Sequence, residues 1–318
     1  MKLCKYGIAF SGGGAKGAAH CGALQALMEY GIKADVVAGT SAGSIAAALY
    51  ASGMKPIDMA NKFSTLDFRD LLDTQVPKGG LFGSKPLVKH IRSLIPYKNI
   101  EELPVETHIV TTCIENGKSQ IFTTGEIAPR VVASCSIPVI FQPMVISGRH
   151  YVDGGVLMNL PVAPIRSRCK TAIAINLHHA SEKKYKDNLA SVAMRSMFLM
   201  FLSNTMPHAE QADIFINIDT SEYSAYDLSK VETLFYIGYD TAVKVLEEKG
   251  FKRQMPQQQL EFLHKEEKPG RIAEMKLAAQ AQARAIANKG AALAESAEKL
   301  LGQAKETLKK QVYLTEKS

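Results

Sequence analysis

The segment VVAGTSAGS, residues 36–44, carries the pattern G-x-S-x-G between an apolar stretch and a helical one. Val36–Ala38 predicts a short buried strand, and the alanine-rich residues 44–51 predict a helix. In this strand–turn–helix setting the turn strains the serine backbone and presents its hydroxyl at a helix N-terminus, where the helix dipole favours a developing negative charge. Ser41 is therefore a candidate nucleophile. The turn around it consists of Gly39, Thr40, Ala42 and Gly43.

A second glycine-rich turn, SGGGAKG at residues 11–17, follows the predicted strand Tyr6–Phe10 and precedes a helical pattern. Consecutive glycines let backbone N–H groups converge at a helix N-terminus, where they bind a pyrophosphate or the oxyanion of acyl transfer. The loop also satisfies G-x-G-x-x-G, so dinucleotide binding stays open as an alternative. Asp35 argues against that alternative, because it precedes its strand instead of following it. The loop residues are Gly12, Gly13, Gly14, Ala15, Lys16 and Gly17.

A third short motif, Asp153-Gly154-Gly155, lies between residues 148–152 and the segment Asn159-Leu160-Pro161. By itself this motif indicates only a turn. An aspartate followed by two glycines also presents its carboxylate with little steric cover.

Strand-like and helical segments alternate along residues 1–250, which predicts one α/β domain with a mainly parallel sheet sandwiched between helices. Residues 251–318 form a linker and an Ala-rich tail, in which apolar residues recur every seven positions from Ile272 to Leu300. This narrow seam predicts a helix that packs on its own domain or on a partner copy of the chain. A basic helix on a membrane surface is the alternative, which the weak apolar face disfavours. We expect strands at 6–10, 36–38, 108–113, 120–123, 171–176 and 214–218, and helices at 18–30, 44–51, 56–66, 127–135, 189–206 and 229–249.

The composition is that of a soluble globular protein: 318 residues, 46% hydrophobic and 22% charged. The net charge of +7 favours anionic surfaces such as membranes, and we expect no nucleic-acid partner. Five cysteines without C-x-x-C spacing indicate reduced thiols and no metal site. The sequence contains neither a signal peptide core nor an apolar run of about 18 residues, so we expect a cytoplasmic protein that contacts membranes at most peripherally.

The three motifs, in this order and spacing, resemble the patatin-like phospholipase family. The segment ASCSIP at residues 133–138 and the continuation to Asn159-x-Pro161 are similar to the same family. The resemblance is strong over residues 5–180, weak to about residue 250, and absent in the tail. It implies a patatin-like α/β sandwich related to cytosolic phospholipase A2.

The resemblance also implies a chemistry. The family consists of serine lipid acyl hydrolases that use a Ser-Asp dyad, form an acyl-enzyme and need no cofactor. Carried over by motif, Ser41 is the nucleophile, Asp153 with Gly154 and Gly155 supplies the base, and the loop from Gly12 to Gly17 forms the oxyanion hole. The expected substrates are phospholipids, lysophospholipids or other acyl glycerolipids. Lys16 departs from the family's usual arginine and loses its bidentate geometry.

Two other interpretations of the same residues stay open. An ordinary α/β-hydrolase triad runs Ser, Asp, His in chain order, and His178, His179 or His208 satisfies that order. A non-catalytic interaction module is the other.

The substrate side of the sequence gives weaker indications. Residues 75–84 are a candidate lid, and the Met- and Phe-rich helix from Met194 to Met206 suits either acyl chains or an ordinary core.

Overall fold

The computed structural model describes residues 3–64, 82–179, 188–225 and 227–263. The described residues outside 188–195 belong to one compact unit, and residues 189–195 are described only as the first turns of a helix. The Ala-rich tail and most of the candidate lid lie outside the described residues. The tail helix, its seam and its role in joining copies therefore stay predictions.

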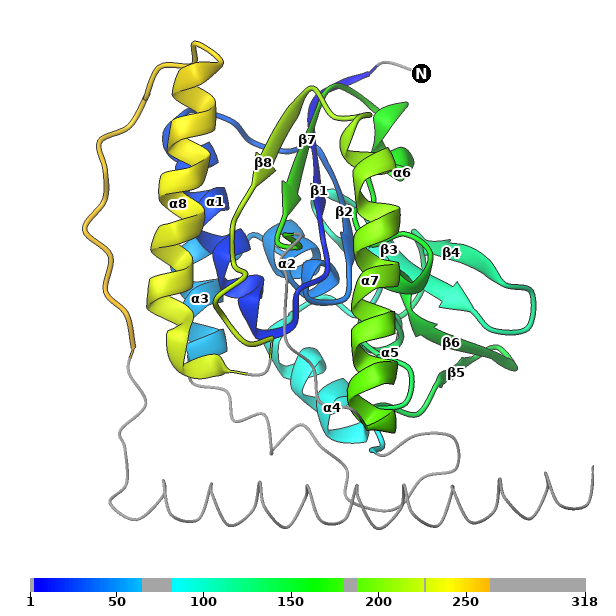
Figure 1. Cartoon of the computed structure of the whole chain (residues 1–318). Helices are drawn as coiled ribbons and strands as arrows, with labels where there is room; N and C mark the ends of the chain where they lie inside the picture. Colours follow the sequence, from blue (N-terminus) through cyan, green and yellow to red (C-terminus); the bar gives the residue numbers. More distant parts are fainter. Residues whose placement is uncertain (1–2, 65–81, 180–187, 226, 264–318) are drawn as a thin grey trace, which may run out of the picture. The chain divides into compact units, whose positions relative to one another are not determined.

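Eight strands form one sheet with the order β5-β6-β3-β2-β1-β7-β8, and β4 also pairs with β3. Strands β1, β2, β3, β7 and β8 are mutually parallel, whereas β4, β5 and β6 are antiparallel to their neighbours (Figure 1). This architecture confirms the expected α/β fold with a mainly parallel sheet. The strands are β1 (Cys4–Phe10), β2 (Val36–Thr40), β3 (Glu106–Cys113), β4 (Lys118–Phe122), β5 (Met144–Ile146), β6 (Arg149–Asp153), β7 (Cys169–Asn176) and β8 (Ile214–Asn217).

The two faces of the sheet bury side chains of different size. Large residues such as Ile8, Phe10 and Ile173 belong to the main core, while Ala9 and Ala174 on the opposite face belong to a smaller core. Successive strand residues point to opposite faces, so this alternation separates a bulky face from a face lined by small side chains. The small face lets short elements pack close to the central strands.

Helices cover both faces, as Figure 1 shows. The main core lies under α1, α2, α3, α5 and α8, and the smaller core lies under α6 and the end of α7. The helices are α1 (Ala18–Glu29), α2 (Ala42–Ala51), α3 (Pro56–Ser64), α4 (Lys85–Leu94), α5 (Ile127–Ser134), α6 (Ala163–Arg166), α7 (Leu189–Ala209) and α8 (Val231–Glu248). Short 3-10 turns include η1 (Gly14–Gly17) and η4 (Gly154–Val156).

The sequence-based expectations omitted four elements: α4, α6, β5 and β6. Helix α4 has a recognisable pattern, since Pro86 stands in its first turn and Leu87 and Ile91 are buried one turn apart. The other three elements have only three to five residues each, too few for a periodic pattern. Among the described residues, no helix is long and apolar enough to cross a bilayer.

Candidate active site

Ser41 lies between β2 and α2 in a backbone conformation that non-glycine residues rarely adopt, with φ 53° and ψ −125°. Hydrogen bonds hold the turn on both sides. The Ser41 N–H donates to Ser134 Oγ at 2.8 Å, and the Ser44 N–H donates to the Ser41 carbonyl oxygen at 2.8 Å. Such strain costs on the order of 1–3 kcal/mol and persists only where the surroundings fix it. The turn has the strained geometry that the G-x-S-x-G pattern predicts.

The two glycines of this pattern are required by close backbone packing. A Cβ on Gly39 would lie 2.1 Å from the Gly43 carbonyl oxygen, and a Cβ on Gly43 would lie 2.2 Å from the Phe10 carbonyl oxygen. Both distances are far below van der Waals contact, so neither position accommodates a side chain. The tight packing places the start of α2 against the end of β1.

Asp153 reaches Ser41 through the register of the sheet. It is the last residue of β6 and pairs with Thr111 of β3. Thr40 of β2 pairs with Val110 along the same edge of β3, because β4 occupies the other edge from Ile109 to Cys113. Ser41 follows Thr40 along that edge, so the end of β2 meets the end of β6 and Ser41 lies next to Asp153. The structure brings together the two residues that the sequence singled out, although they are 112 positions apart.

The Asp153 carboxyl is fully buried, and burial raises its pKa to about 7. The Ser41 hydroxyl and the Gly155 N–H lie against the carboxyl and lower the pKa, but burial has the larger effect. The Gly155 N–H donates to Asp153 Oδ1 at 2.8 Å. Asp153 Oδ2 has no partner with hydrogen-bond geometry in the described part of the chain. The Ser41 contact is therefore loose, as catalytic hydrogen bonds often are before substrate binds.

The glycine loop curls beside the nucleophile where β1 ends. A Cβ on Gly12 would lie 3.3 Å from Ser41 Cβ, and Gly14 adopts a φ of +61° that favours glycine. The Gly12 N–H donates to the Asn159 carbonyl oxygen at 3.2 Å. Within the described ranges, the N–H groups of Gly13 and Gly14 donate to no protein acceptor. Two backbone donors thus remain available in the loop whose first glycine, Gly12, borders Ser41.

The rest of the loop is enclosed by the protein itself. A Cβ on Gly14 would lie 2.5 Å from the Ala225 carbonyl oxygen, and one on Gly17 would lie 3.1 Å from Ala42 Cβ. The Lys16 side chain is buried. Burial of the His178 ring lowers the pKa of His178 most, and the nearby positive charge of Lys16 lowers it further. This close cover resembles a structural cradle more than an open pyrophosphate site.

Asp35 does not reach the glycine loop. Its Oδ2 accepts hydrogen bonds from the Lys5 and Tyr6 N–H groups at the amino end of the sheet. The acidic residue that a dinucleotide fingerprint requires is therefore at the wrong end of the strands.

The three candidate triad histidines lie apart from the Asp153 carboxyl. His178 is buried, and burial lowers its pKa to about 3. His179 contacts Asn217, and His208 lies on α7 with a half-buried ring whose pKa burial also lowers. None of the three is hydrogen-bonded or ion-paired to Asp153 within the part of the chain that is described.

Apolar residues of α7 reach the site and also face solvent. The Phe198 and Phe201 rings lie 5.5 and 6.2 Å from the His178 ring, centre to centre. A Cβ on Gly155 would lie 3.3 Å from Phe201 Cδ1. Leu199 and Met200 on the same helix are 46% and 38% exposed. This helix is therefore more than an ordinary core element.

The candidate lid is described only at its end. Residues 75–81 lie outside the described ranges. The Phe82 N–H donates to the Ile140 carbonyl oxygen at 3.0 Å, and the Phe82 carbonyl oxygen accepts from the Gln142 N–H at 2.9 Å. This end is thus tied to the segment that follows Cys135, which borders Ser41 and Ser44.

Two residues at the site, Ser134 and Asn159, lie in the family-like motifs, but the motifs alone indicate no role for either of them. Ser134 supports the Ser41 turn and donates its own hydroxyl to the Val110 carbonyl oxygen at 2.6 Å. Asn159 is 1% exposed and borders Gly12 and Gly155. Their place in the segments ASCSIP and Asn159-x-Pro161 was the only available signal.

The glycine loop, the Ser41 turn and the Asp153 motif thus meet at one end of the sheet. Residues 8–165 match the sequence model of the family described as patatin-like phospholipase. The matched segment includes the glycine loop, Ser41 and Asp153, so this part of the chain belongs to the patatin-like phospholipase family. The resemblance expected from the motifs is confirmed.

Individual relatives agree with this assignment. An uncharacterized NTE family protein of Mycobacterium tuberculosis is 32% identical over 184 residues, covering 57% of this chain and 51% of that protein. Lysophospholipase NTE1 of Saccharomyces cerevisiae is 26% identical over 269 residues, covering 74% of this chain and 16% of that protein. The chain thus spans about half of the mycobacterial relatives. The crystal structure of VipD from Legionella pneumophila shares the fold, with a TM-score of 0.51 at 18% identity over 78% of this chain and 67% of VipD.

Proposed function

We propose that this chain is a serine lipid acyl hydrolase that cleaves ester bonds of phospholipids, lysophospholipids or other acyl glycerolipids. One observation carries the proposal: the strained Ser41 turn faces a fully buried Asp153 whose pKa is raised to about 7. The family match and the printed name of the yeast relative, a lysophospholipase, support the same substrate class.

In the proposed reaction, Ser41 Oγ attacks the ester carbonyl carbon while Asp153 takes the hydroxyl proton. Asp153 then gives that proton to the departing alcohol, and an acyl-Ser41 intermediate remains. A carboxylate with an ordinary pKa near 4 is a weak base. A pKa of about 7 matches neutral conditions far better, because general-base catalysis is most efficient when the pKa lies near the working pH.

The oxyanion of each tetrahedral intermediate is assigned to the backbone. The N–H groups of Gly13 and Gly14 donate to no acceptor in the described structure, and the first turn of α2 begins directly after Ser41. One such donor typically contributes about 3–4 kcal/mol to transition-state stabilisation. Water then hydrolyses the acyl-enzyme. Each step uses groups of the chain itself, so the proposal invokes no cofactor.

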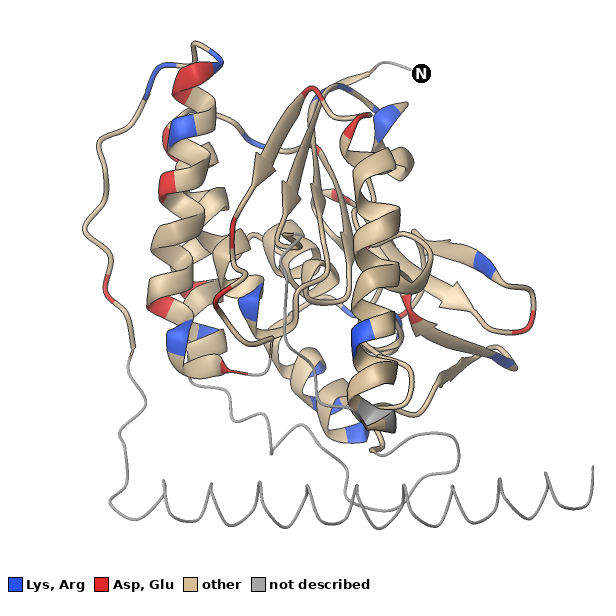
Figure 2. Cartoon of the chain, in the orientation of Figure 1, with Lys and Arg blue, Asp and Glu red and all other residues tan. Residues whose placement is uncertain are grey.

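The lipid side of the proposal rests on α7 and α4. Phe201 borders Gly155 beside the Asp153 carboxyl, and Phe198 lies with Phe201 against the His178 ring. Both supply apolar surface suited to an acyl chain. On α4, Lys85 and Lys89 are exposed one turn apart, and Arg92 continues that face while paired with Glu126. Figure 2 shows several basic positions along this helix. Cations on one helix face favour peripheral contact with an anionic lipid surface.

A fluorophosphonate probe tests the proposal directly, because it labels an activated serine. We expect labelling at Ser41, mapped by peptide mass, and none in Ser41→Ala. The matched control is Ser203→Ala, which removes an exposed hydroxyl on α7 and keeps the labelling. Rates of hydrolysis of p-nitrophenyl esters, and of lysophosphatidylcholine in mixed micelles, then show which acyl chain length the enzyme prefers.

Histidine variants separate the dyad from the triad. His179→Ala and His208→Ala are expected to keep ester hydrolysis within about threefold of wild type, since neither contacts Asp153 in the described structure. Loss of hydrolysis in either folded variant would favour a triad. A folded wild-type chain that neither reacts with the probe nor cleaves any ester in micelles would overturn the proposed function.

A further inference from the structure

Two oxygen atoms beside Ser41 are buried without a hydrogen-bond donor in the described part of the chain: Asp153 Oδ2 and Asn159 Oδ1. Both side chains are at most 1% exposed. Burying an acceptor without a donor destabilises a protein, and each such atom in a folded structure requires a physical explanation. Asp153 already has one as the proposed base. Asn159 needs one of its own.

The nitrogen of the Asn159 amide fixes how the group is turned. Nδ2 donates to Thr205 Oγ1 at 3.0 Å and lies 3.3 Å from His178 Nδ1. The Thr205 hydroxyl donates to the Phe201 carbonyl oxygen at 2.8 Å, so toward Asn159 its oxygen can only accept. Both amide hydrogens thus have acceptors on the side of α7 and His178.

The contact with Asn159 Nδ2 sets the tautomer of the His178 ring, because Nδ1 accepts from the amide only when the ring proton is on Nε2. Burial has the largest effect on the pKa of this ring, and the Gly12 backbone acts against it by raising the pKa. Burial lowers the pKa of His178 to about 3, so the ring stays neutral and keeps this arrangement.

The free oxygen of Asn159 lies between the two proposed catalytic groups. A Cβ on Gly12 would lie 2.7 Å from Asn159 Oδ1 and 3.3 Å from Ser41 Cβ. A Cβ on Gly155 would lie 3.2 Å from Asn159 Oδ1 and 3.0 Å from Asp153 Oδ1. Asn159 Oδ1 is therefore a fixed acceptor that borders both Ser41 and Asp153.

We propose that Asn159 is a positioning residue for the water molecule that hydrolyses the acyl-enzyme. This inference rests on the proposed function. A water molecule carries two hydrogens on one oxygen, and two acceptors without donors, Asp153 Oδ2 and Asn159 Oδ1, match that pair. Held by both, its oxygen lone pair is directed at the acyl carbon on Ser41.

Hydrolysis of the acyl-enzyme then proceeds through a tetrahedral intermediate on Ser41. The water oxygen bonds to the acyl carbon, and one water proton moves to the Asp153 carboxylate. The other hydrogen remains on the new hydroxyl and donates to Asn159 Oδ1. The bond between the acyl carbon and Ser41 Oγ then breaks, Asp153 returns its proton to Ser41, and the free fatty acid leaves.

The experiment separates the two half-reactions. Asn159→Leu keeps the branching and the number of heavy atoms of the side chain and removes the acceptor. With a p-nitrophenyl ester, rapid mixing reports acylation as the first release of p-nitrophenol, and acid-quenched intact mass reports acyl-Ser41. The matched control is Asn217→Ala, an amide on β8 at the same end of the sheet, which lies beyond β1 and β7 from Ser41.

We expect Asn159→Leu to acylate within about threefold of wild type, to accumulate acyl-enzyme and to turn over about 10²-fold more slowly, since misplacing a reactant by about 1 Å has that effect. Hydroxylamine, which attacks the acyl-enzyme without needing a positioned water, should restore turnover. Thr205→Val should show a smaller loss in the same phase, because it removes one anchor of the amide. This second variant keeps the test decisive where Asn159→Leu fails to fold.

Two results would overturn the inference. One is an equal slowing of both phases in a folded Asn159→Leu, which a purely structural role predicts. The other is unchanged turnover. Failure of the proposed function is distinguishable, because the wild-type chain would then show neither a first phase nor probe labelling at Ser41.

Discussion

The two ends of the same sheet treat polar groups in opposite ways. At the amino end, charged side chains are partly exposed and paired. At the carboxyl end, Ser41, Asp153 and Asn159 are buried, and two of their oxygen atoms have no donor in the described structure. Unpaired buried polar groups destabilise a protein. The buried oxygen atoms at the carboxyl end therefore do not contribute to the stability of the fold. The difference indicates which end carries chemistry.

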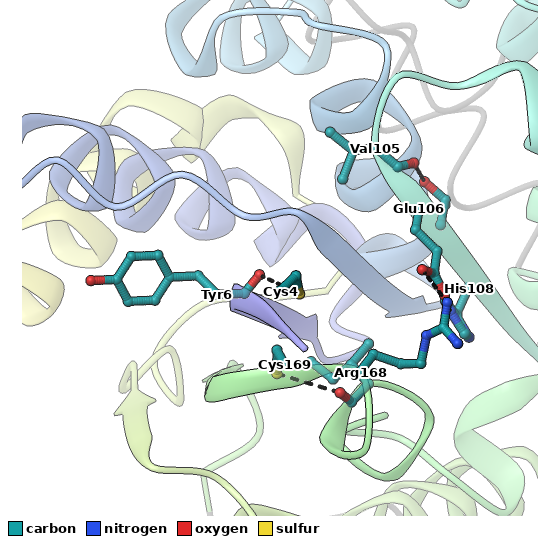
Figure 3. A network of polar contacts seen from close by, with 9 residues as sticks. Cys4, Tyr6, Val105, Glu106, His108, Arg168 and Cys169 are labelled. Carbon is teal, nitrogen blue, oxygen red and sulfur yellow. Dashed lines mark hydrogen bonds and ion pairs between the residues drawn. The ribbon is translucent and has the colours of Figure 1, made fainter. Parts of the chain in front are cut away.

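Figure 3 shows the amino end in detail. Glu106 at the start of β3 forms an ion pair with Arg168 at 2.7 Å and contacts His108 at 2.9 Å. Partial burial alone would raise the pKa of Glu106, but hydrogen bonds from Arg168 and His108 hold it below its usual value. Arg166 and Asp213 form another pair at this end. Such pairs fasten strand ends without straining any backbone.

The largest expected effect comes from Asp153→Asn, which keeps the shape of the side chain and removes the base. We expect ester hydrolysis to fall by about 10⁴-fold, comparable to the loss when a triad aspartate is replaced by asparagine. The measurement is kcat/KM on a p-nitrophenyl ester. Retention of more than a tenth of the activity would show that another group takes the Ser41 proton.

The same substitution should stabilise the fold at high pH. The folded pKa of Asp153, about 7, is above its ordinary value of 3.8, so between these values the folded state keeps a proton that the unfolded state has released. Stability therefore falls as pH rises from about 4 to 7, by about 4 kcal/mol for a shift of this size. Urea unfolding should show Asp153→Asn more stable than wild type at pH 8, with a smaller gain at pH 5.

Gly43→Ala is expected to have the next largest effect, because it disrupts the turn around Ser41. The added Cβ would lie 2.2 Å from the Phe10 carbonyl oxygen, so the turn must move. We expect a loss of about 3 kcal/mol in unfolding free energy, together with loss of probe labelling. Gly53→Ala is the control, since its Cβ meets nothing within 4 Å and only its φ of +88° opposes the change. Equal losses at both glycines would contradict the tight-packing argument.

The acid limb of the pH profile identifies the base. Because Asp153 must be ionised to accept a proton, kcat/KM should fall about tenfold per pH unit below about 7 and level off above it. If His178 were the base, its pKa of about 3 would leave kcat/KM unchanged near neutral pH. The limb should stay in place in His179→Ala and His208→Ala, and its movement in either variant would assign the titration to that histidine.

Sequence patterns predicted the carboxyl end better than its supporting contacts. The turn at Ser41, the glycine loop and the Asp153 motif are local, because small residues at fixed spacing specify each of them. The role of Asn159 is not local: its amide is fixed by His178 and Thr205, which are 19 and 46 positions away. Such partners depend on how α7 packs, which spacing alone does not report.

The smallest expected effect belongs to the amino end. Glu106→Gln removes the charge that pairs with Arg168, whose side chain is 31% exposed. Pairs this exposed contribute less than about 1 kcal/mol, so unfolding free energy at pH 7 should drop by that amount or less. Since Glu106 pairs with Val36 at the amino end of β2, whereas Ser41 follows the other end, kcat/KM should not change.

The small loss should vanish as acid protonates Glu106, because its stabilising effect is present only while the carboxylate is charged. A change in kcat/KM above about threefold would show that the two ends are coupled through β2 and β3, and the contrast between them would then not separate structure from function.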